Sequence, residues 1–230
     1  MKDIAIYVEG GGNRMDSKDA KAALRIGFDQ LLNSQKQAAR NKKLGWRLVP
    51  CGNRDRAYKA FANAIKTSGL ETVTVLLVDS EESIPPEVEI RKEESPAERH
   101  SRLQTNARTR CNFLARRDSW DFSDINPEQV HLMVQCMETW IVADRKALQE
   151  FYGQGFRANL MPVRNDLEDE PKQNIYKQLE LASKDSRKGA YSKITHASKL
   201  LSLIDSQKIG ARCSRFSTFV GWLSDQIDIA

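Results

Sequence analysis

The sequence lacks the features that mark membrane-spanning, secreted and zinc-binding proteins. It contains no apolar run near the ~20 residues of a bilayer-spanning helix, and its first residues show no charged-then-apolar secretory pattern. Its four cysteines, Cys51, Cys111, Cys136 and Cys213, form no CxxC pair. We therefore expect a cytoplasmic protein with no membrane association, whose thiols are buried rather than engaged in zinc sites or disulfides.

Common nucleotide-binding and histidine-based motifs are also missing. Neither GxxxxGK[ST] nor GxGxxG occurs, and His100, His131 and His196 show no metal-ligand spacing or triad order. No internal repeat or low-complexity segment is present. The chemistry has to be sought among the charged residues, which make up 29% of the chain.

The length and composition indicate one well-packed core with an extension. The chain has 230 residues, of which 40% are hydrophobic, enough for one domain and an addition to it. The net charge of +5 weakly favours a polyanionic partner such as nucleic acid.

Short apolar segments alternate with helical patterns through the first two thirds of the chain. The segments Ile4–Val8, Trp46–Val49, Val73–Val78 and Val130–Met137 predict strands, and the polar stretch 33–43 shows no clear helical pattern. Strands that alternate with helices predict an α/β fold with a mainly parallel sheet flanked by helices.

The expected α/β domain covers residues 1–152 and ends with a helix over 138–152. Residues 153–170 resemble a linker, and short helices near 175–183, 198–204 and 215–227 predict a helical C-terminal extension, 153–230, packed on the domain.

Acidic residues follow three of the predicted strands. Glu9 ends the first, Asp79 and Glu81 end the third, and Glu138 follows the fourth. The carboxyl ends of parallel strands meet at one edge of a sheet, and carboxylate oxygens are ligands that Mg²⁺ prefers. Each acid alone is better explained as a helix cap or a solvated turn. Their combination favours a site that holds Mg²⁺ or Mn²⁺.

Three glycines, Gly10, Gly11 and Gly12, follow Glu9 directly. Glycine lets the backbone approach a phosphate closely, and the start of the next helix offers free N–H groups. The run is a candidate phosphate-binding loop, and weak evidence when taken alone.

With these residues placed, the chain resembles the toprim superfamily. That domain carries a Glu after its first strand and Asp-x-Asp after its third, which serve Mg²⁺; Glu9 and the segment Asp79-Ser80-Glu81 match them, with Glu81 in place of the second Asp. The departure leaves the metal geometry and a second ion open. The resemblance implies a toprim-like sheet over residues 1–152.

A closer likeness is to a family of small bacterial proteins of unassigned function, often encoded beside ATPases in phage-defence loci and related to overcoming-lysogenization-defect nucleases. It rests on YVEGGG at 7–12, LVDSE at 77–81, LMVQCMETW at 132–140, GQGF at 153–156 and KGAYSK at 188–193. The likeness implies a nuclease that acts as the effector of a partner ATPase in antiviral defence.

If the protein is a nuclease, the acidic residues and a lysine would have separate catalytic roles. Glu9, Asp79 and Glu81 would be metal ligands, with Glu9 also a candidate general base, and Glu138 a further ligand or the group that orients a water. Lys193, or Lys188, would place a cation near the phosphate if the C-terminal segment folds over the site.

A basic stretch precedes the fourth predicted strand. Leu103, Ala107, Cys111 and Leu114 recur at helical spacing, so residues 97–117 are expected to form an amphipathic helix inserted in the domain. Six arginines could grip a nucleic-acid backbone: Arg99, Arg102, Arg108, Arg110, Arg116 and Arg117. A solvated face paired with the acidic stretch 87–94, or a protein interface, explains them equally well.

Three functions therefore compete. The first is a Mg²⁺-dependent nuclease acting on DNA or RNA; the second is a non-catalytic regulator or adaptor that docks on a partner ATPase. The third is a phosphohydrolase of small phosphate esters, which would need a closed pocket. A homo-oligomer is compatible with all three.

Overall fold

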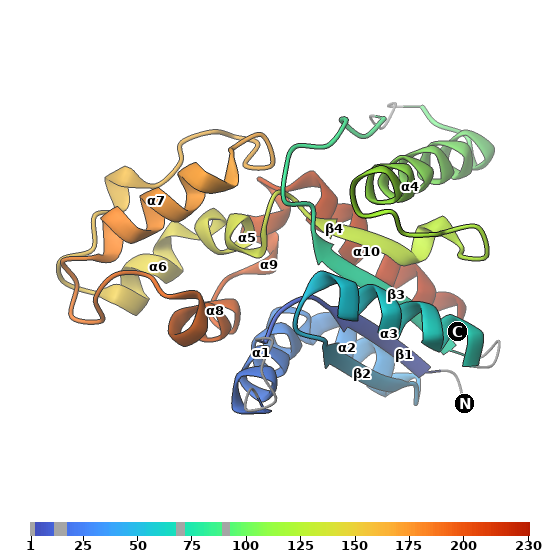
Figure 1. Cartoon of the computed structure of the whole chain (residues 1–230), viewed down its shortest axis with the longest axis horizontal. Helices are drawn as coiled ribbons and strands as arrows, with labels where there is room; N and C mark the ends of the chain where they lie inside the picture. Colours follow the sequence, from blue (N-terminus) through green and yellow to red (C-terminus); the bar gives the residue numbers. More distant parts are fainter. Residues whose placement is uncertain (1–2, 12–17, 68–71, 89–92) are drawn as a thin grey trace.

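The chain folds around a four-stranded parallel sheet (Figure 1). The computed structural model describes residues 3–11, 18–67, 72–88 and 93–230. The sheet has the order β2-β1-β3-β4 and every neighbouring pair is parallel. Its strands are β1 (Asp3–Val8), β2 (Gly45–Pro50), β3 (Thr72–Asp79) and β4 (Val130–Met133). This confirms the predicted α/β class and its parallel sheet.

Helices connect the strands and form the C-terminal part. Those before β4 are α1 (Lys18–Leu31), α2 (Asn33–Asn41), α3 (Arg54–Thr67), α4 (Pro96–Asp118) and the 3₁₀ turn η1 (Pro127–Gln129). Those after β4 are α5 (Met137–Ala143), α6 (Arg145–Tyr152), the 3₁₀ turn η2 (Ala158–Leu160), α7 (Lys172–Ser183), α8 (Lys193–Leu201), α9 (Ser206–Gly210) and α10 (Ser214–Ile229).

Both faces of the sheet are covered, as the apolar run of β3 predicts. Leu76 and Val78 of this strand pack into a cluster with residues of α3 and α4. Val75 and Leu77 point to the other face, into a cluster with residues of α1, α5 and α10. Successive side chains of a strand alternate between faces, so a strand covered on both sides reads as continuously apolar.

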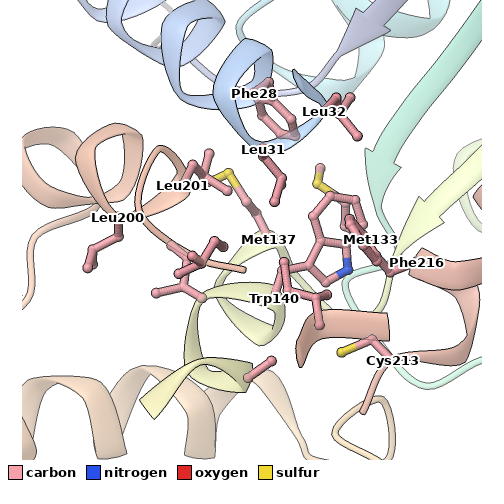
Figure 2. Packing of buried hydrophobic residues seen from close by; sticks show 14 of the residues in the cluster. Phe28, Leu31, Leu32, Met133, Met137, Trp140, Leu200, Leu201, Cys213 and Phe216 are labelled. Atoms are coloured by element: carbon pink, nitrogen blue, oxygen red, sulfur yellow. The ribbon is translucent and has the colours of Figure 1, made fainter. Parts of the chain in front are cut away.

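The larger cluster joins the C-terminal helices to the sheet (Figure 2). Its centre is Trp140 of α5, which is fully buried and makes edge contacts with Phe28 of α1 and Phe216 of α10. Helix α8 packs along α1 through Leu200 and Leu201. Helices far apart in the sequence thus hold the segment that follows β4 in place. The predicted division at residue 152 stays a prediction.

Four of the predicted elements differ in their bounds. The polar stretch 33–43 contains helix α2, because its Gln, Lys, Ala and Arg residues favour helices and Ala39 is buried beside α10. The predicted helix 138–152 is broken at Asp144, whose side chain caps α6 by accepting from Ala147 N. The predicted strand 130–137 ends at Met133, and the helix predicted at 198–204 is α8, which starts at Lys193.

The structure confirms that the cysteines are buried. All four cysteines are buried free thiols. No helix within the described ranges combines the length and apolar character required to cross a bilayer.

Candidate metal centre

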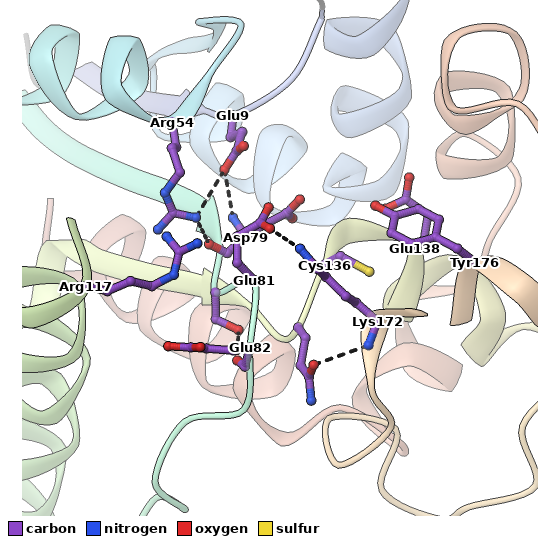
Figure 3. Close-up of polar contacts among 12 residues, drawn as sticks. Glu9, Arg54, Asp79, Glu81, Glu82, Arg117, Cys136, Glu138, Lys172 and Tyr176 are labelled. Carbon is purple, nitrogen blue, oxygen red and sulfur yellow. Dashed lines mark hydrogen bonds and ion pairs between the residues drawn. The ribbon is translucent and has the colours of Figure 1, made fainter. Parts of the chain in front are cut away.

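Three carboxylates meet at the carboxyl edge of the sheet (Figure 3). Glu9 follows β1, Asp79 is the last residue of β3, and Glu81 lies two residues further on. One oxygen from each lies within 4.8 Å of the other two. We call these residues the acidic triad. The convergence follows from parallel neighbouring strands whose ends share one edge.

Backbone amides fix two of the three carboxylates. Asp79 N donates to Glu9 Oε2 at 3.2 Å, and Met137 N, in the first turn of α5, donates to Asp79 Oδ1 at 2.8 Å. The helix N-terminus also offers a favourable dipole to the Asp79 carboxylate. Asp79 is only 2% exposed. The site is therefore pre-shaped by backbone groups of β3 and α5.

Glu81 is held by the segment that follows β4 and by the first residue of α7. Its backbone lies in the left-handed region, with φ +71°, and its N–H donates to the Gln135 carbonyl at 2.7 Å. Its Oε2 accepts a hydrogen bond from Lys172 Nζ. Burial raises the pKa of Glu81, but the hydrogen bond and charge of Lys172 outweigh it, so the pKa lies below its usual range. A non-glycine residue with positive φ is strained and persists only where its surroundings hold it. The hydrogen bonds to Gln135 and Lys172 hold Glu81 in this conformation.

The other two carboxylates of the triad are unfavourable as anions in the metal-free chain. Burial raises the pKa of Asp79 well above its usual range, and Glu9, Glu138 and Glu81 add to this against the opposing charge of Lys193. Burial also raises the pKa of Glu9, although Arg54 opposes it. A bound cation would relieve both penalties.

The donor set fits a small divalent ion. Mg²⁺ and Mn²⁺ take hard oxygen ligands, and Mg²⁺ binds them at about 2.1 Å, so neighbouring oxygens lie about 3 Å apart and opposite ones about 4.2 Å apart. The triad oxygens, within 4.8 Å of one another, would draw closer together around a bound ion. The residues would suit a metal ion, as predicted, and the geometry does not choose between Mg²⁺ and Mn²⁺.

Glu138 lies outside the acidic triad, to one side of it and next to Tyr176 (Figure 3). It has no exposed surface, and both of its oxygens are engaged: Oε2 accepts from Tyr176 at 3.0 Å and Oε1 from Tyr191 at 2.8 Å. These two hydrogen bonds fix the Glu138 carboxylate, and its position suits the fixing of a neighbouring cation.

That cation is Lys193, the first residue of α8. Its Nζ lies 3.6 Å from Asp79 Oδ2 and 3.5 Å from Glu138 Oε1, and its side chain is 47% exposed. Burial lowers the pKa of Lys193, but Asp79 and Glu138 raise it more, so it stays charged. The C-terminal part therefore does bring Lys193 to the site. Lys188 instead lies over the ring of Phe151.

Arg54 is a further cation at this edge. As the first residue of α3, it donates to the Asp79 carbonyl at 2.8 Å and pairs with Asp118 at 2.6 Å. It also lies 3.9 Å from Glu9 Oε2 and 5.3 Å from the centre of the Trp120 ring. Arg54 thus links the acidic triad to the end of α4.

Sequence reasoning missed four residues at this site: Arg54, Lys172, Tyr176 and Tyr191. Arg54 follows the second strand, so the argument from strand ends would have found it. Lys172 and Tyr176 carry no local pattern that points to the site.

The first glycine after Glu9 is bonded to the loop that follows β2. Gly10 and Gly52 exchange two backbone hydrogen bonds of 2.6 and 2.8 Å, so the Gly10 N–H is engaged. Gly10 has φ +122° and Gly11 φ +87°, values that favour glycine. Gly12 lies outside the described residues. Phosphate binding at this loop stays a prediction.

The arginines of α4 divide into two groups. Arg110 is 4% exposed and binds Glu87 and the Val130 carbonyl, and Arg102 pairs with Glu94. Both therefore bind the acidic stretch 87–94, the alternative considered above for the whole helix. Four others are exposed: Arg99, which reaches Asp225, Arg108, Arg116, and Arg117, which pairs with Asp118. Nucleic-acid binding stays a prediction for these four, and burial removes Arg110 from any phosphate's reach.

Two arginines of α4 allow a matched test of this division. We expect Arg110→Ala to lower the free energy of unfolding by about 3 kcal/mol, because it leaves Glu87 and the Val130 carbonyl without their partner. Arg108→Ala, on the exposed face, should change it by less than about 0.5 kcal/mol. Urea denaturation followed by circular dichroism measures both. Equal losses of unfolding free energy in the two variants would contradict the structural role of Arg110.

One comparison with known proteins gives a match. The model of the family described as Domain of unknown function (DUF4276) matches residues 12–224. No curated protein and no solved structure matches the chain.

Proposed function

We propose that this chain, which belongs to the DUF4276 family of domains of unknown function, is a divalent-metal-dependent nuclease that hydrolyses phosphodiester bonds in DNA or RNA. The observation that carries the proposal is the acidic triad at the edge of the parallel sheet, with Lys193 beside it. The triad supplies oxygen ligands for the metal, and Lys193 supplies a cation for the phosphate.

Glu9, Asp79 and Glu81 would hold the ion, which when bound would polarise the phosphate and lower the pKa of a water. Two side chains of the protein would complete the catalytic site. Lys193 Nζ, half exposed and steadied by Glu138, can donate to a phosphate oxygen and offset the charge that builds there. Glu9, whose pKa burial raises, is placed to accept the proton of the attacking water. Water oxygen bonds to phosphorus as the bond to the leaving oxygen breaks, and that oxygen takes up a proton.

We further propose, from the resemblance, a toprim-type domain and a partner ATPase. The sheet with Glu9 and Asp79 at its edge suits a toprim-type domain, and the likeness favours a partner ATPase in antiviral defence. The exposed Arg117 of α4 favours a polyanionic substrate, since it is close enough to the site to lower the pKa of Glu81. Copurification with the product of a neighbouring ATPase gene tests the partner.

The direct test incubates the purified chain, with and without that partner, with plasmid DNA, RNA and tRNA in Mg²⁺, Mn²⁺ or EDTA. Cleavage that requires the ion and is lost in Glu9→Gln supports the proposal. Hydrolysis of p-nitrophenyl phosphate without cleavage of any polymer would instead favour a small-ester phosphohydrolase. Cleavage unchanged in EDTA and in Glu9→Gln would reject metal-dependent catalysis by this site.

The contacts of Lys172 and Arg54 favour one alternative, a non-catalytic adaptor. Both cations already compensate carboxylates of the triad in the metal-free chain. In an adaptor these ion pairs would be structural, and Mn²⁺ would neither bind nor raise the melting temperature. An ATPase complex that forms normally with Asp79→Asn and shows no ion-dependent cleavage would establish the alternative.

A further inference from the structure

Each residue of the acidic triad keeps one oxygen that accepts no hydrogen bond within the described residues, although Asp79 Oδ2 lies 3.6 Å from Lys193 Nζ. Glu9 Oε2 accepts from Asp79 N, Asp79 Oδ1 accepts from Met137 N, and Glu81 Oε2 accepts from Lys172. Within the described ranges, Glu9 Oε1, Asp79 Oδ2 and Glu81 Oε1 accept no hydrogen bond. Three oxygens with added waters satisfy one Mg²⁺ or Mn²⁺ ion, which commonly takes few carboxylates.

A second ion in a two-metal site would lie about 3.5–4 Å from the first and would add two more positive charges. The triad carries three carboxylates, and Lys172, Lys193 and Arg54 already lie against them. The described part of the chain holds no other group of three metal-ligating side chains. The charge balance therefore favours one divalent ion over two.

The ammonium groups of two lysines lie against the triad. Lys172 Nζ contacts Glu81 on one side, and Lys193 Nζ lies 3.6 Å from Asp79 on the other (Figure 3 shows Lys172). Lys172 is anchored independently, since its backbone N–H donates to Gln135 Oε1 at 3.2 Å while the Gln135 carbonyl accepts from Glu81 N. One loop residue, Gln135, thus sets the positions of both Lys172 and Glu81.

We infer that the site takes a single divalent ion and that Lys172 occupies the place of a second one, as a fixed cation at the Glu81 side of the triad. The inference rests on the proposed function and specifies its metal content. Lys172 is a positioning residue: it holds Glu81 and supplies charge, while like-charge repulsion keeps a second ion away. The first ion binds against the same repulsion.

The test counts Mn²⁺ bound to the full-length, metal-stripped chain by calorimetry and by the electron paramagnetic resonance signal of free Mn²⁺. One equivalent is expected. Two equivalents would overturn the inference and leave the nuclease proposal standing. No binding at all would overturn both, beginning with the metal site itself.

Lys172→Met separates charge repulsion from a structural role. Without the ammonium group, Mn²⁺ should bind about 10-fold more tightly, because the ion no longer competes with Lys172 for Glu81. Lys172→Arg, which keeps the charge, should bind like the wild type, and so should Lys177→Met, on the exposed side of the same helix. Weaker or unchanged binding in Lys172→Met would overturn the inference, since a lysine that only braced Glu81 would weaken the site when removed.

Discussion

Asp79→Asn is expected to lower metal-dependent cleavage by about 10³-fold and to leave the metal-free chain at least as stable as the wild type. The asparagine keeps the oxygen that accepts from Met137 N but loses the charge that a divalent ion requires. Nuclease rates at saturating Mg²⁺ and urea denaturation in EDTA measure the two effects.

The stability half of this prediction follows from the direction of the pKa shift. Burial raises the pKa of Asp79 in the folded chain above its value in the unfolded chain. The folded state then binds more protons than the unfolded state between the two values, so stability falls as pH rises through that window. Above that window the ionised Asp79 opposes folding, and a neutral amide removes this cost.

Glu82→Gln is the matched control for Asp79→Asn. It removes the same charge three residues along the chain, from an exposed side chain outside the acidic triad. Cleavage and stability should both stay close to wild type. A large loss of cleavage in Glu82→Gln, or full activity in Asp79→Asn, would contradict the assignment of the site.

Lys193→Met is expected to lower the turnover number by about 10²-fold with little loss of substrate affinity. Lys193 faces the triad from the first turn of α8 and is steadied by Glu138, so its charge is ready for the phosphate at the transition state. The rates are measured with a short oligonucleotide of the preferred nucleic acid. Mn²⁺ affinity should not fall, because Lys193 is no metal ligand.

Lys199→Met controls for the general charge of α8, since Lys199 is exposed on the same helix and contacts no carboxylate of the site within the described residues. It should cleave like the wild type. A loss in Lys193→Met that appears only as weaker Mn²⁺ binding would mean that Lys193 organises the carboxylates and does not act on the substrate.

The convergence of Glu9, Asp79 and Glu81 was predictable because strand ends follow from local apolar patterns, and parallel strands align those ends. The position of Lys172 was not. It depends on how the segment after α6 returns over the sheet, which is decided by contacts such as that of Lys172 N with Gln135. No periodicity in the sequence encodes such a return.

For Glu138, the sequence predicts the position of the residue but not its hydrogen-bond partners. Its place after the fourth strand predicts the correct edge of the sheet, but its partners decide its chemistry. Tyr176 and Tyr191 come from α7 and from the segment just before α8, and they hold both of its oxygens. Helix α2 was missed for a related reason: a polar helix is specified by propensity and by one buried alanine, Ala39, which a search for apolar periodicity overlooks.

The most direct test of the account is a crystal of the chain grown with Mn²⁺ and measured at the manganese absorption edge. The account predicts one anomalous peak within about 2.3 Å of oxygens of Glu9, Asp79 and Glu81, with Lys172 still beside Glu81. Well-ordered carboxylates without a peak between them, at Mn²⁺ concentrations that support cleavage, would contradict it.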